Sequence, residues 1–461
     1  MNTHCNFYID GQWVEPAGAH TVHAAVSPGD ESVVGEVMMG SAEDANRAVA
    51  AARRAFDSYS ETTLAYRTEM LQKLQAVFER RYDEMAHAIS TEMGAPWDWA
   101  YEQQAECGPG HIKATLEAAK DFQWETRSGD NADLICEPIG VCLLITPWNW
   151  PLNQIALKVA PCLAAGNTMI LKPSEECPAN AAIFAEILHA AGVPAGVFNL
   201  VQGDGPTVGQ AISSHPGIDM VSFTGSTRAG ILVAKAAADT VKRVHQELGG
   251  KSPNIVLPGS DLPAVLPATV SGVFINSGQS CISPARILVH KDQEAEAVSV
   301  IKNLMASVPV GDPLQEGGHI GPVVNKTQYE KIQGLIQSGI DEGATLETGG
   351  TGLPANVNRG YYVKPTVFSG VTPDMRIARE EIFGPVAAVM TYAVLDEAIE
   401  IANDTEYGLS AVISGDPAKA ASVAPKLRAG MVAINAWGPT PGTPFGGYKQ
   451  SGNGREGGLF G

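Results

Sequence analysis

The sequence lacks the segments that mark export or membrane insertion. Its start, MNTHCNFYIDGQW, has no basic stretch followed by an apolar run. No segment approaches the roughly 18–20 continuous apolar residues that cross a bilayer. We therefore predict a cytoplasmic protein that has no membrane as a partner.

Cysteine is scarce, and its spacing suits neither disulfides nor a metal site. The number of cysteines is odd, no CxxC pair occurs, and no histidine cluster at metal-ligand spacing accompanies them. We expect reduced thiols and no bound metal. The cysteines are Cys5, Cys107, Cys136, Cys142, Cys162, Cys177 and Cys281.

Basic residues are outnumbered by acidic ones. The 31 lysines and arginines stand against 50 aspartates and glutamates, which gives a formal net charge of −19 without a long run of either sign. This balance disfavours nucleic acid and anionic membranes as partners. With 461 residues, 44% of them hydrophobic, the chain can bury large cores in two or three domains.

Short apolar runs alternate with helical stretches in two parts of the chain. From residue 140 the runs are GVCLLITP, NTMILKP, VFNLVQG and DMVSFTG, and after Cys281 they are ARILVH, VAAVMTY, LSAVISG and MVAIN. Such alternation predicts parallel sheets covered by helices on both faces. The fold class is therefore α/β with two domains, and the boundary lies near residue 250.

The first 140 residues predict scaffold helices and a hairpin. Residues 41–59 start with a serine cap and carry apolar residues at helical spacing, and another helical stretch covers 62–93. The segment 121–138 predicts a protruding hairpin around Ser128–Asn131, because its turn residues interrupt both neighbouring patterns.

Unusual polar residues follow the strands of the first series. Ligands of an open parallel sheet gather beyond the carboxyl ends of its strands, and ITPWNWP, LKPSEE and SFTGSTRAG stand there. Gly225 and Ser226 would present free backbone N–H groups and a hydroxyl to a phosphate at a helix start, a tight turn without a ligand being the alternative. The apolar stripe predicted for that helix is Ile231, Ala234, Ala238 and Val241.

A lysine and a carboxylate follow the neighbouring strand. Lys172 and Glu175 can both hydrogen-bond ribose hydroxyls, and the carboxylate would repel a 2′-phosphate. A solvated surface pair is the alternative interpretation.

Seven motifs together carry a resemblance to a known family. TPWNWP, KPSE, FTGSTRAG, ELGGKSPNIV, NSGQSCISPAR, EEIFGPV and PFGGYKQSGNGRE occur in this order, and with them the chain resembles the NAD(P)-dependent aldehyde dehydrogenase superfamily over nearly its whole length. The resemblance implies a Rossmann-like cofactor domain (1–120 and 139–249), an oligomerisation hairpin (121–138), a second α/β catalytic domain (250–437) and a C-terminal segment (438–461) that returns towards the cofactor region.

The resemblance implies a thiol enzyme. Cys281 matches the cysteine whose thiolate attacks the aldehyde carbon, although a lone intracellular cysteine is usually an inert apolar residue. Asn149 matches the amide that holds the oxyanion together with the Cys281 backbone N–H. Glu247 matches the general base that activates water, and Lys158 matches a lysine of a proton path, a surface lysine being the alternative.

The resemblance also implies the cofactor and substrate residues. Glu381 and Phe383 match residues that hold the nicotinamide ribose and ring, and Glu175 favours NAD, with NADP as the alternative. Trp150 and Phe445 would line an apolar aldehyde tunnel, core packing being the alternative. The full set of predicted cofactor residues is Ile145, Thr146, Pro147, Trp148, Lys172, Ser174, Glu175, Gly205, Gly209, Phe223, Thr224, Gly225, Ser226, Leu248, Glu381 and Phe383.

We therefore expect oxidation of an aldehyde to a carboxylic acid through a thiohemiacetal and a thioester. Glu247 argues against the alternative of a coenzyme A-acylating enzyme, since such members generally lack this base. Cys281, Asn149 and Glu247 together argue against a catalytically silent member of the fold. No arginine near Cys281 demands a carboxylate-bearing aldehyde, and no acidic and aromatic cage demands a quaternary ammonium, so an aromatic or medium-chain apolar aldehyde is expected.

The end of the chain bears on assembly. Chains of the family continue past the position of GREGGLFG into a tail whose strand adds to a partner's sheet, whereas this sequence stops at Gly461. We expect a truncated tail, an unpaired sheet edge, and a homodimer or homotetramer.

Overall fold

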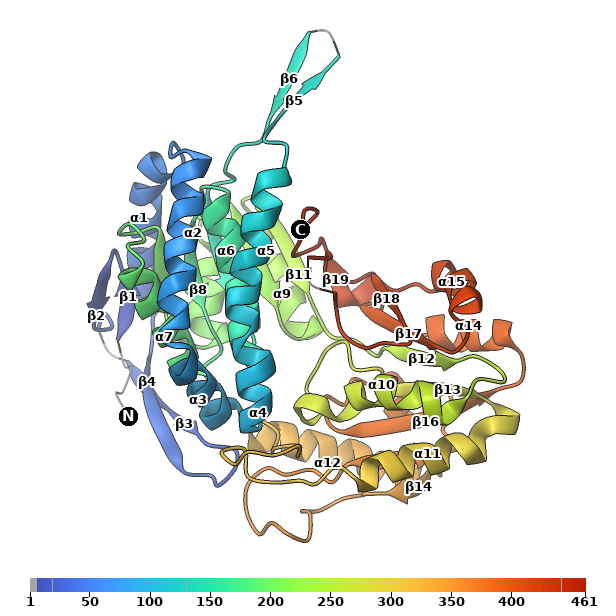
Figure 1. Cartoon of the computed structure of the whole chain (residues 1–461). Helices are drawn as coiled ribbons and strands as arrows, with labels where there is room; N and C mark the ends of the chain where they lie inside the picture. The colour runs from blue at the N-terminus through green and yellow to red at the C-terminus, as the bar shows by residue number, and fades with distance from the viewer. Residues whose placement is uncertain (1–5, 19, 130, 441) are drawn as a thin grey trace.

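The computed structural model describes residues 6–18, 20–129, 131–440 and 442–461. Two β-sheets with their helices form two halves that lie side by side, and a narrow hairpin stands off the first half (Figure 1). Within the described residues, no helix is both long and apolar enough to cross a membrane.

The first sheet contains eight strands in the order β19-β11-β10-β7-β8-β9-β1-β2. The four predicted strands are confirmed, and a fifth parallel strand, β11, was missed. The parallel strands are β7 (Val141–Ile145), β8 (Thr168–Lys172), β9 (Phe198–Leu200), β10 (Met220–Thr224) and β11 (Arg243–Glu247). The antiparallel strands are β1 (Phe7–Ile9), β2 (Gln12–Val14) and β19 (Gly452–Asn453).

Helices cover both faces of this sheet because its strands are apolar on both faces. On β7, Cys142 and Leu144 pack into one core, whereas Val141 and Leu143 pack into another on the opposite face. Helices α2, α3, α5, α6 and α7 supply the first core, and α1, α8 and α9 contact the second. The helices are α1 (Ala42–Tyr59), α2 (Leu64–Glu79), α3 (Tyr82–Met93), α4 (Trp97–Trp99), α5 (Cys107–Asp121), α6 (Pro151–Ala164), α7 (Pro178–Ala190), α8 (Gln210–Ser214) and α9 (Thr227–Ala238).

Two details of the predicted helices are corrected. Residues 62–93 form α2 and α3 rather than one stretch, because the backbone of Arg81 is not helical. The predicted stripe on α9 is also wrong, since Ile231 is 46% exposed and Val241, beyond the end of the helix, is 92% exposed. Gly230 and Ala237 face the sheet instead.

The second sheet contains seven strands in the order β14-β15-β16-β13-β12-β17-β18. The four predicted strands β13, β16, β17 and β18 are confirmed, and β12, β14 and β15 were missed. The strands are β12 (Pro253–Val256), β13 (Arg286–His290), β14 (Thr345–Thr348), β15 (Thr366–Ser369), β16 (Val386–Tyr392), β17 (Ser410–Ser414) and β18 (Met431–Ile434). The helices are α10 (Leu262–Phe274), α11 (Glu294–Ala306), α12 (Lys326–Asp341), α13 (Arg376–Arg379), α14 (Leu395–Asn403) and α15 (Pro417–Val423).

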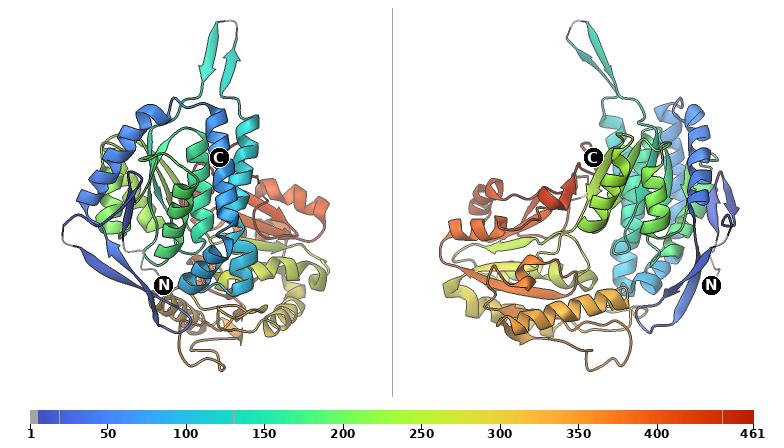
Figure 2. Two further views of the ribbon diagram at one scale, coloured as in Figure 1. Left: turned by 60° about the vertical axis from the view of Figure 1, so that its left-hand side comes forward. Right: turned by 180° about the vertical axis from the view of Figure 1, so that it is seen from behind.

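Two separate hairpins complete the fold. The predicted hairpin is confirmed as β5 (Glu125–Ser128) paired with β6 (Ala132–Ile135), and every residue of both strands is exposed. It projects from the body in every view (Figure 2). The second hairpin pairs β3 (Thr21–Val26) with β4 (Val33–Met39).

The C-terminal segment crosses back from the second sheet to the first. Its strand β19 pairs antiparallel with β11, so that Gly452 stands opposite Glu247. Further along, the backbones of Phe445 and Glu456 also pair. The last residues of the chain therefore lie at the junction of the two halves (Figure 2).

Candidate active site

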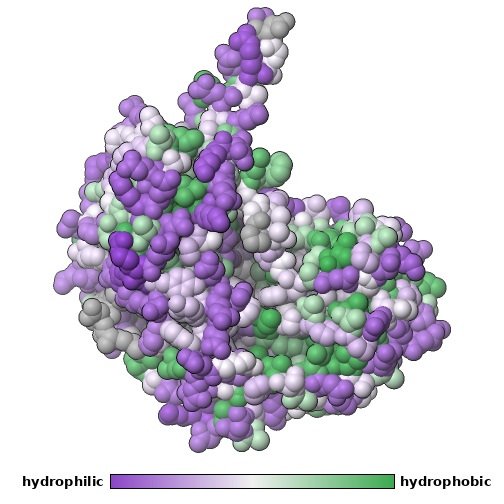
Figure 3. Space-filling view, in the orientation of Figure 1, coloured by the Kyte–Doolittle hydropathy of each residue, from purple (hydrophilic) through white to green (hydrophobic). Residues whose placement is uncertain are grey.

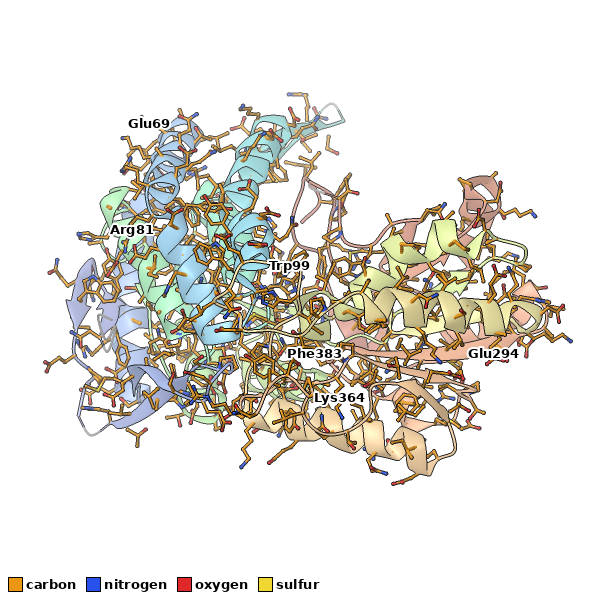
Figure 4. All side chains as sticks on the ribbon, turned by 60° about the horizontal axis from the view of Figure 1, so that its bottom comes forward. Glu69, Arg81, Trp99, Glu294, Lys364 and Phe383 are labelled. Atoms are coloured by element: carbon orange, nitrogen blue, oxygen red, sulfur yellow. The ribbon has the colours of Figure 1, made fainter. Side chains whose placement is uncertain are left out.

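The predicted site residues converge where the carboxyl ends of the first sheet face the second sheet. Asn149 follows β7, Glu247 ends β11, and Cys281 lies in the loop between α10 and β13. The molecular surface is hollowed between the two halves (Figure 3). Trp99 and Phe383 both lie at this junction, whereas Glu294 lies far out on the second half (Figure 4).

The loop before Cys281 has an unusual backbone. Asn276 and Ser277 adopt φ values of 56° and 55°, which are left-handed and rare for residues other than glycine. Buried contacts hold this conformation, since Ser277 Oγ donates a hydrogen bond of 2.7 Å to the Gly321 carbonyl. A side chain at Gly250 would clash with the Cys281 carbonyl oxygen, so this glycine allows the loop to approach β11 closely.

A network of buried amides fixes Asn149. Its Nδ2 donates to the Gln279 carbonyl at 3.1 Å, and Asn276 Nδ2 donates to the Asn149 carbonyl at 2.9 Å. Gln104 Nε2 in turn donates to Asn276 Oδ1 at 2.8 Å. The amide of Asn149 is thereby held in place beside the loop that carries Cys281.

Sequence reasoning missed the residues that support Asn149. Gln104 stands on a π-helical turn, Ala100–Ala105, between α4 and α5, and its contact with Asn276 spans 172 residues. The polar residues of the motif NSGQ could have indicated that Asn276 and Gln279 form hydrogen bonds near the site. No local pattern indicated Gln104, because nothing in the sequence near it points to a π-turn.

The surroundings of Cys281 oppose its ionisation. The residue is half-buried and carries a free thiol. Burial raises the pKa of this thiol well above its usual value, and the carboxylates of Glu381 and Glu247 raise it further, while the backbone N–H groups of Cys281 and Ile282 act in the opposite direction. Burial and the two carboxylates therefore favour the protonated form of the thiol.

Glu247 has the properties of a proton acceptor. Burial raises its pKa to about 7, although the hydrogen bond with His245 lowers it. Its Oε1 lies 3.2 Å from His245 Nε2, whereas the buried Oε2 has no hydrogen-bond partner among the described residues. A carboxylate with a pKa near neutral pH and one unpaired oxygen suits general-base catalysis.

Lys158 is buried, so the alternative of a surface lysine is wrong. Its Nζ forms an ion pair with Glu456 and donates to Ser222 Oγ at 3.0 Å. Burial raises the pKa of Glu456, but Lys158 and His245 outweigh it and lower that pKa to about 2. Sequence reasoning missed Glu456 and His245, because the contacts join β11, α6 and the C-terminal segment.

Lys172 and Glu175, the two residues predicted for a ribose site, lie close together. The ammonium of Lys172 is 3.7 Å from Glu175 Oε2, and it donates to the carbonyls of Pro173 and Gly203. Lys172 is buried at the end of β8, which rules out a solvated pair. Its pKa is lowered by burial, while Glu175 acts to raise it.

The turn between β10 and α9 differs from the prediction. The N–H of Gly225 is not free, since it donates to the Glu247 carbonyl at 3.0 Å. Ser226 Oγ accepts from the Ala229 N–H at 3.3 Å and so caps α9. Nearby, at the ends of β7 and β10, the buried hydroxyls of Thr146 and Thr224 have no hydrogen-bond partner among the described residues.

Residues predicted to hold the nicotinamide meet from both halves. The rings of Trp148 and Phe383 contact edge to face, with centroids 5.4 Å apart. Glu381 Oε1 accepts from the Gly250 N–H at 2.9 Å. The remaining predicted cofactor residues lie in or beside β7, the segment after β8, the turn after β9, β10 and β11: Ile145, Pro147, Ser174, Gly205, Gly209, Phe223 and Leu248.

Aromatic side chains lie beside the cysteine loop. Trp150 Nε1 donates to Ser280 Oγ at 3.0 Å, next to Cys281, and the ring contacts Trp99 edge to face at 5.8 Å. Phe445 is half-buried opposite Glu456. In the described part of the chain, no group of three or more His, Cys, Asp or Glu side chains is placed to hold a metal ion.

The sequence model of the aldehyde dehydrogenase family matches residues 13–461. The chain belongs to the aldehyde dehydrogenase family. This match confirms the resemblance, and solved aldehyde dehydrogenases confirm the predicted fold class. The enzyme from Bartonella henselae superimposes with a TM-score of 0.97 at 47% identity, covering 100% of this chain and 97% of that one.

Two further aldehyde dehydrogenases are similar over the whole length. The 3-succinoylsemialdehyde-pyridine dehydrogenase of a Pseudomonas species is 49% identical, over 100% of this chain and 97% of its own. A mutant of aldehyde dehydrogenase C from Pseudomonas syringae, in complex with NAD+ and octanal, has a TM-score of 0.97 at 48% identity, over 99% of this chain and 94% of that chain.

Proposed function

We propose that this aldehyde dehydrogenase oxidises an apolar aldehyde to a carboxylic acid with NAD. The observation that carries the proposal is the convergence of Cys281, the anchored amide of Asn149 and the unpaired Oε2 of Glu247 between the two sheets. These groups are a nucleophile, an oxyanion donor and a general base. Lys158 belongs to the ionised cluster behind the base.

Each residue has a defined part in the chemistry. The Cys281 thiol releases its proton to solvent water as its sulfur bonds to the aldehyde carbon, and Asn149 Nδ2 together with the Cys281 N–H stabilises the oxygen that becomes negative. NAD supplies the hydride acceptor when it is bound. Glu247 Oε2 then takes a proton from the water that attacks the thioester carbon, and the carboxylic acid leaves.

The described residues fit a dinucleotide at the edge of the first sheet. The orphaned hydroxyls of Thr146 and Thr224 suit polar groups of a ligand, and Lys172 with Glu175 suits ribose hydroxyls. Glu175 supports NAD over NADP, because a carboxylate repels a 2′-phosphate. Kinetics with both cofactors test this choice, and a higher kcat/KM with NADP would contradict it.

The aromatic side chains support an aromatic or medium-chain apolar aldehyde. Trp150 and Trp99 contact each other beside the cysteine loop, and Phe445 is half-buried on the C-terminal segment. The Pseudomonas syringae relative forms a complex with octanal. The other Pseudomonas relative is named as a dehydrogenase of a semialdehyde that carries a pyridine ring. Kinetics on an aldehyde panel from propanal to decanal, with benzaldehyde, test the substrate class.

Glu247 supports hydrolysis rather than transfer to coenzyme A. Its buried carboxylate with an unpaired oxygen is suited to activate water. A turnover rate that does not change when coenzyme A is added is the expected result. A rate that depends on coenzyme A would identify the acylating reaction instead.

We also propose an organisation for the whole chain. The segments 1–120 and 139–249 form the cofactor domain, 250–437 the catalytic domain, 438–461 the returning segment and 121–138 an oligomerisation element of a homodimer or homotetramer. The described cysteines are all free, which supports a cytoplasmic location.

The direct test of the activity is Cys281→Ala. We expect this variant to produce no NADH with any aldehyde, while it binds NAD with an unchanged Kd, because the sulfur is the nucleophile and not a cofactor ligand. Cys136→Ala, at an exposed cysteine of the hairpin region, is the matched control and should retain full turnover. Normal turnover of Cys281→Ala would refute the mechanism.

A further inference from the structure

His245 lies between two buried carboxylates. It precedes Glu247 by two residues on β11, so both side chains project from the same face of the strand. His245 Nε2 lies 3.2 Å from Glu247 Oε1, and Nδ1 lies 3.4 Å from Glu456 Oε1. Both carboxylates need donors, so an imidazole ring with a proton on each nitrogen satisfies both contacts.

The contact continues from Glu456 to Lys158. Glu456 Oε1 pairs with Lys158 Nζ and accepts from Ser222 Oγ at 3.1 Å. The side chains of Glu247, His245, Glu456 and Lys158 are all buried. With the His245 ring protonated and both carboxyl groups ionised, charges alternate in sign along the row, which is the pairing that buried ions require.

The C-terminal segment is shaped around the two β11 side chains. A Cβ at Gly454, whose φ is +80°, would clash with His245 Cδ2. A Cβ at Gly446, whose φ is +153°, would lie 2.7 Å from Glu247 Oε1. Glycine at both positions lets the backbone close over the ring and the carboxylate, so the ring has little freedom to turn.

We propose that His245 is a positioning residue for the general base: it holds Glu247 Oε1, is itself held by Glu456, and thereby keeps Oε2 available to the hydrolytic water. This inference rests on the proposed function. Cys281, Asn149 and Glu247 carry out the chemistry, and His245 acts on it through Glu247 alone.

The charge of His245 also sets when Glu247 is ionised. The groups that face the ring are Glu247 on its own strand, Ser222 from β10 and Glu456 from the C-terminal segment, with Lys158 from α6 behind Glu456. Burial lowers the pKa of His245, but the two carboxylates outweigh it and the net pKa is raised. The resulting imidazolium favours the carboxylate form of Glu247 and so offsets part of the effect of burial.

Two substitutions separate the contact with Glu247 from the contact with Glu456. In His245→Gln, the amide nitrogen reaches the position of Nε2 and still donates to Glu247 Oε1. In His245→Asn, the shorter amide reaches only Ser222 and Glu456, so Glu247 loses its donor. The full-length variants are compared by thermal unfolding, by the pH profile of kcat, and by the rapid burst of NADH that reports acylation.

The expected result is a defect in hydrolysis alone. In His245→Asn, the pKa of Glu247 rises, so the acidic limb of the kcat profile moves up by about one pH unit and kcat at pH 7 falls about fivefold. The NADH burst keeps its full amplitude, because Cys281 and Asn149 are untouched. His245→Gln lies closer to the wild type. Equal pH profiles in all three proteins, or equal loss of burst and turnover in both variants, would overturn the proposal.

A second measurement tests the contact between His245 and Glu247 and needs no aldehyde. The His245 ring is titrated by NMR in the wild type and in Glu247→Gln, which loses the carboxylate 3.2 Å from Nε2. The His245 pKa should fall by about one unit in Glu247→Gln, and an unchanged value would overturn the proposal. If His245→Asn does not fold, this titration still tests whether His245 contacts Glu247. A wild type that makes no NADH but shows the shift would refute the proposed function while leaving the contact standing.

Discussion

Cys281 and Glu247 are adapted to each other through their protonation states. The thiol is held protonated by burial and by nearby carboxylates, one of which is Glu247 itself. When Glu247 takes a proton, the negative charge that opposes the thiolate disappears. The carboxyl group of Glu247 therefore opposes the thiolate less when it is protonated than when it is ionised.

The pH dependence of turnover follows from Glu247. Its pKa is raised to about 7, and only the ionised form accepts a proton from water. We expect kcat to be low below pH 6 and to rise through pH 7 to a plateau when hydrolysis limits the rate. In Glu247→Gln, kcat should fall by a factor of about 10²–10⁴, and its rise between pH 6 and pH 8 should disappear. Steady-state assays measure both effects. A wild-type kcat that is flat from pH 5 to 8 would contradict the assignment.

The raised pKa of Cys281 predicts slow alkylation. Because the thiolate is the reactive form, the rate of iodoacetamide modification at Cys281 should still be rising at pH 9. Mass spectrometry of the Cys281 peptide measures this rate, and the exposed Cys136 in the same protein is the reference. Fast alkylation of Cys281 at pH 6 would show that its thiolate is stabilised at rest.

At the scale of elements, the π-helical turn Ala100–Ala105 carries a residue of the amide network around Asn149. The turn places Gln104 inside the protein, where its Nε2 donates to Asn276 Oδ1, while the adjacent Gln103 is exposed. Through Asn276, the turn fixes the carbonyl of Asn149. Extra residues in helical turns of this kind are frequent near functional sites.

Gln104→Leu should weaken both folding and catalysis. The substitution leaves the buried Asn276 Oδ1 without this donor, which destabilises the protein by about 1–3 kcal/mol. It also loosens Asn149, so kcat should fall while the Kd for NAD stays unchanged. Gln103→Leu, at the exposed neighbour, is the matched control for unfolding and kinetics. Equal values for the two variants would show that the amide network does not support the site.

Among the parallel strands of the first sheet, the predicted strands and the missed strand β11 differ in one respect. Strands β7, β8 and β10 are buried and largely apolar, so their runs were visible in the sequence. Strand β11 has the sequence RVHQE. Because most of its residues are polar, the sequence did not indicate a buried strand, although His245, Gln246 and Glu247 are all buried. Polar residues are usually exposed, but at a candidate active site they can be buried. Prediction of strands from apolar runs therefore fails at such positions.

The candidate site was predictable only where a motif was local. Cys281, Asn149 and Glu247 stand in short motifs, whereas Gln104, His245 and Glu456 act through partners that the fold supplies. The expectation for Gly225 failed for a related reason, because its N–H is used by the neighbouring strand. Hydrogen bonds between residues far apart in the chain cannot be predicted from short sequence motifs.

At the scale of the whole molecule, the β5–β6 hairpin predicts self-assembly. A two-stranded hairpin is marginally stable by itself, yet this one is fully exposed and presents Leu134 and Ile135, which are 56% and 66% exposed. Burial against a second subunit would remove this apolar surface from water.

A double substitution, Leu134→Glu with Ile135→Glu, should therefore lower the oligomeric mass. Multi-angle light scattering measures the mass, and thermal unfolding shows whether the subunit remains folded. Val33→Glu, at an exposed apolar position of the other hairpin, is the control and should leave the mass unchanged. An unchanged mass of the double variant would exclude the hairpin from assembly.

The return of the C-terminal segment to β11 has a consequence for biosynthesis. Lys158 precedes its partner Glu456 by 298 residues, so at about 5–20 residues per second a ribosome needs roughly 15–60 s to connect them. During that interval β11 has no β19 beside it, and the buried lysine has no counter-ion. The buried ion pair of Lys158 and Glu456, and the pairing of β19 with β11 beside Glu247, therefore form only after residues 452–456 have been synthesised.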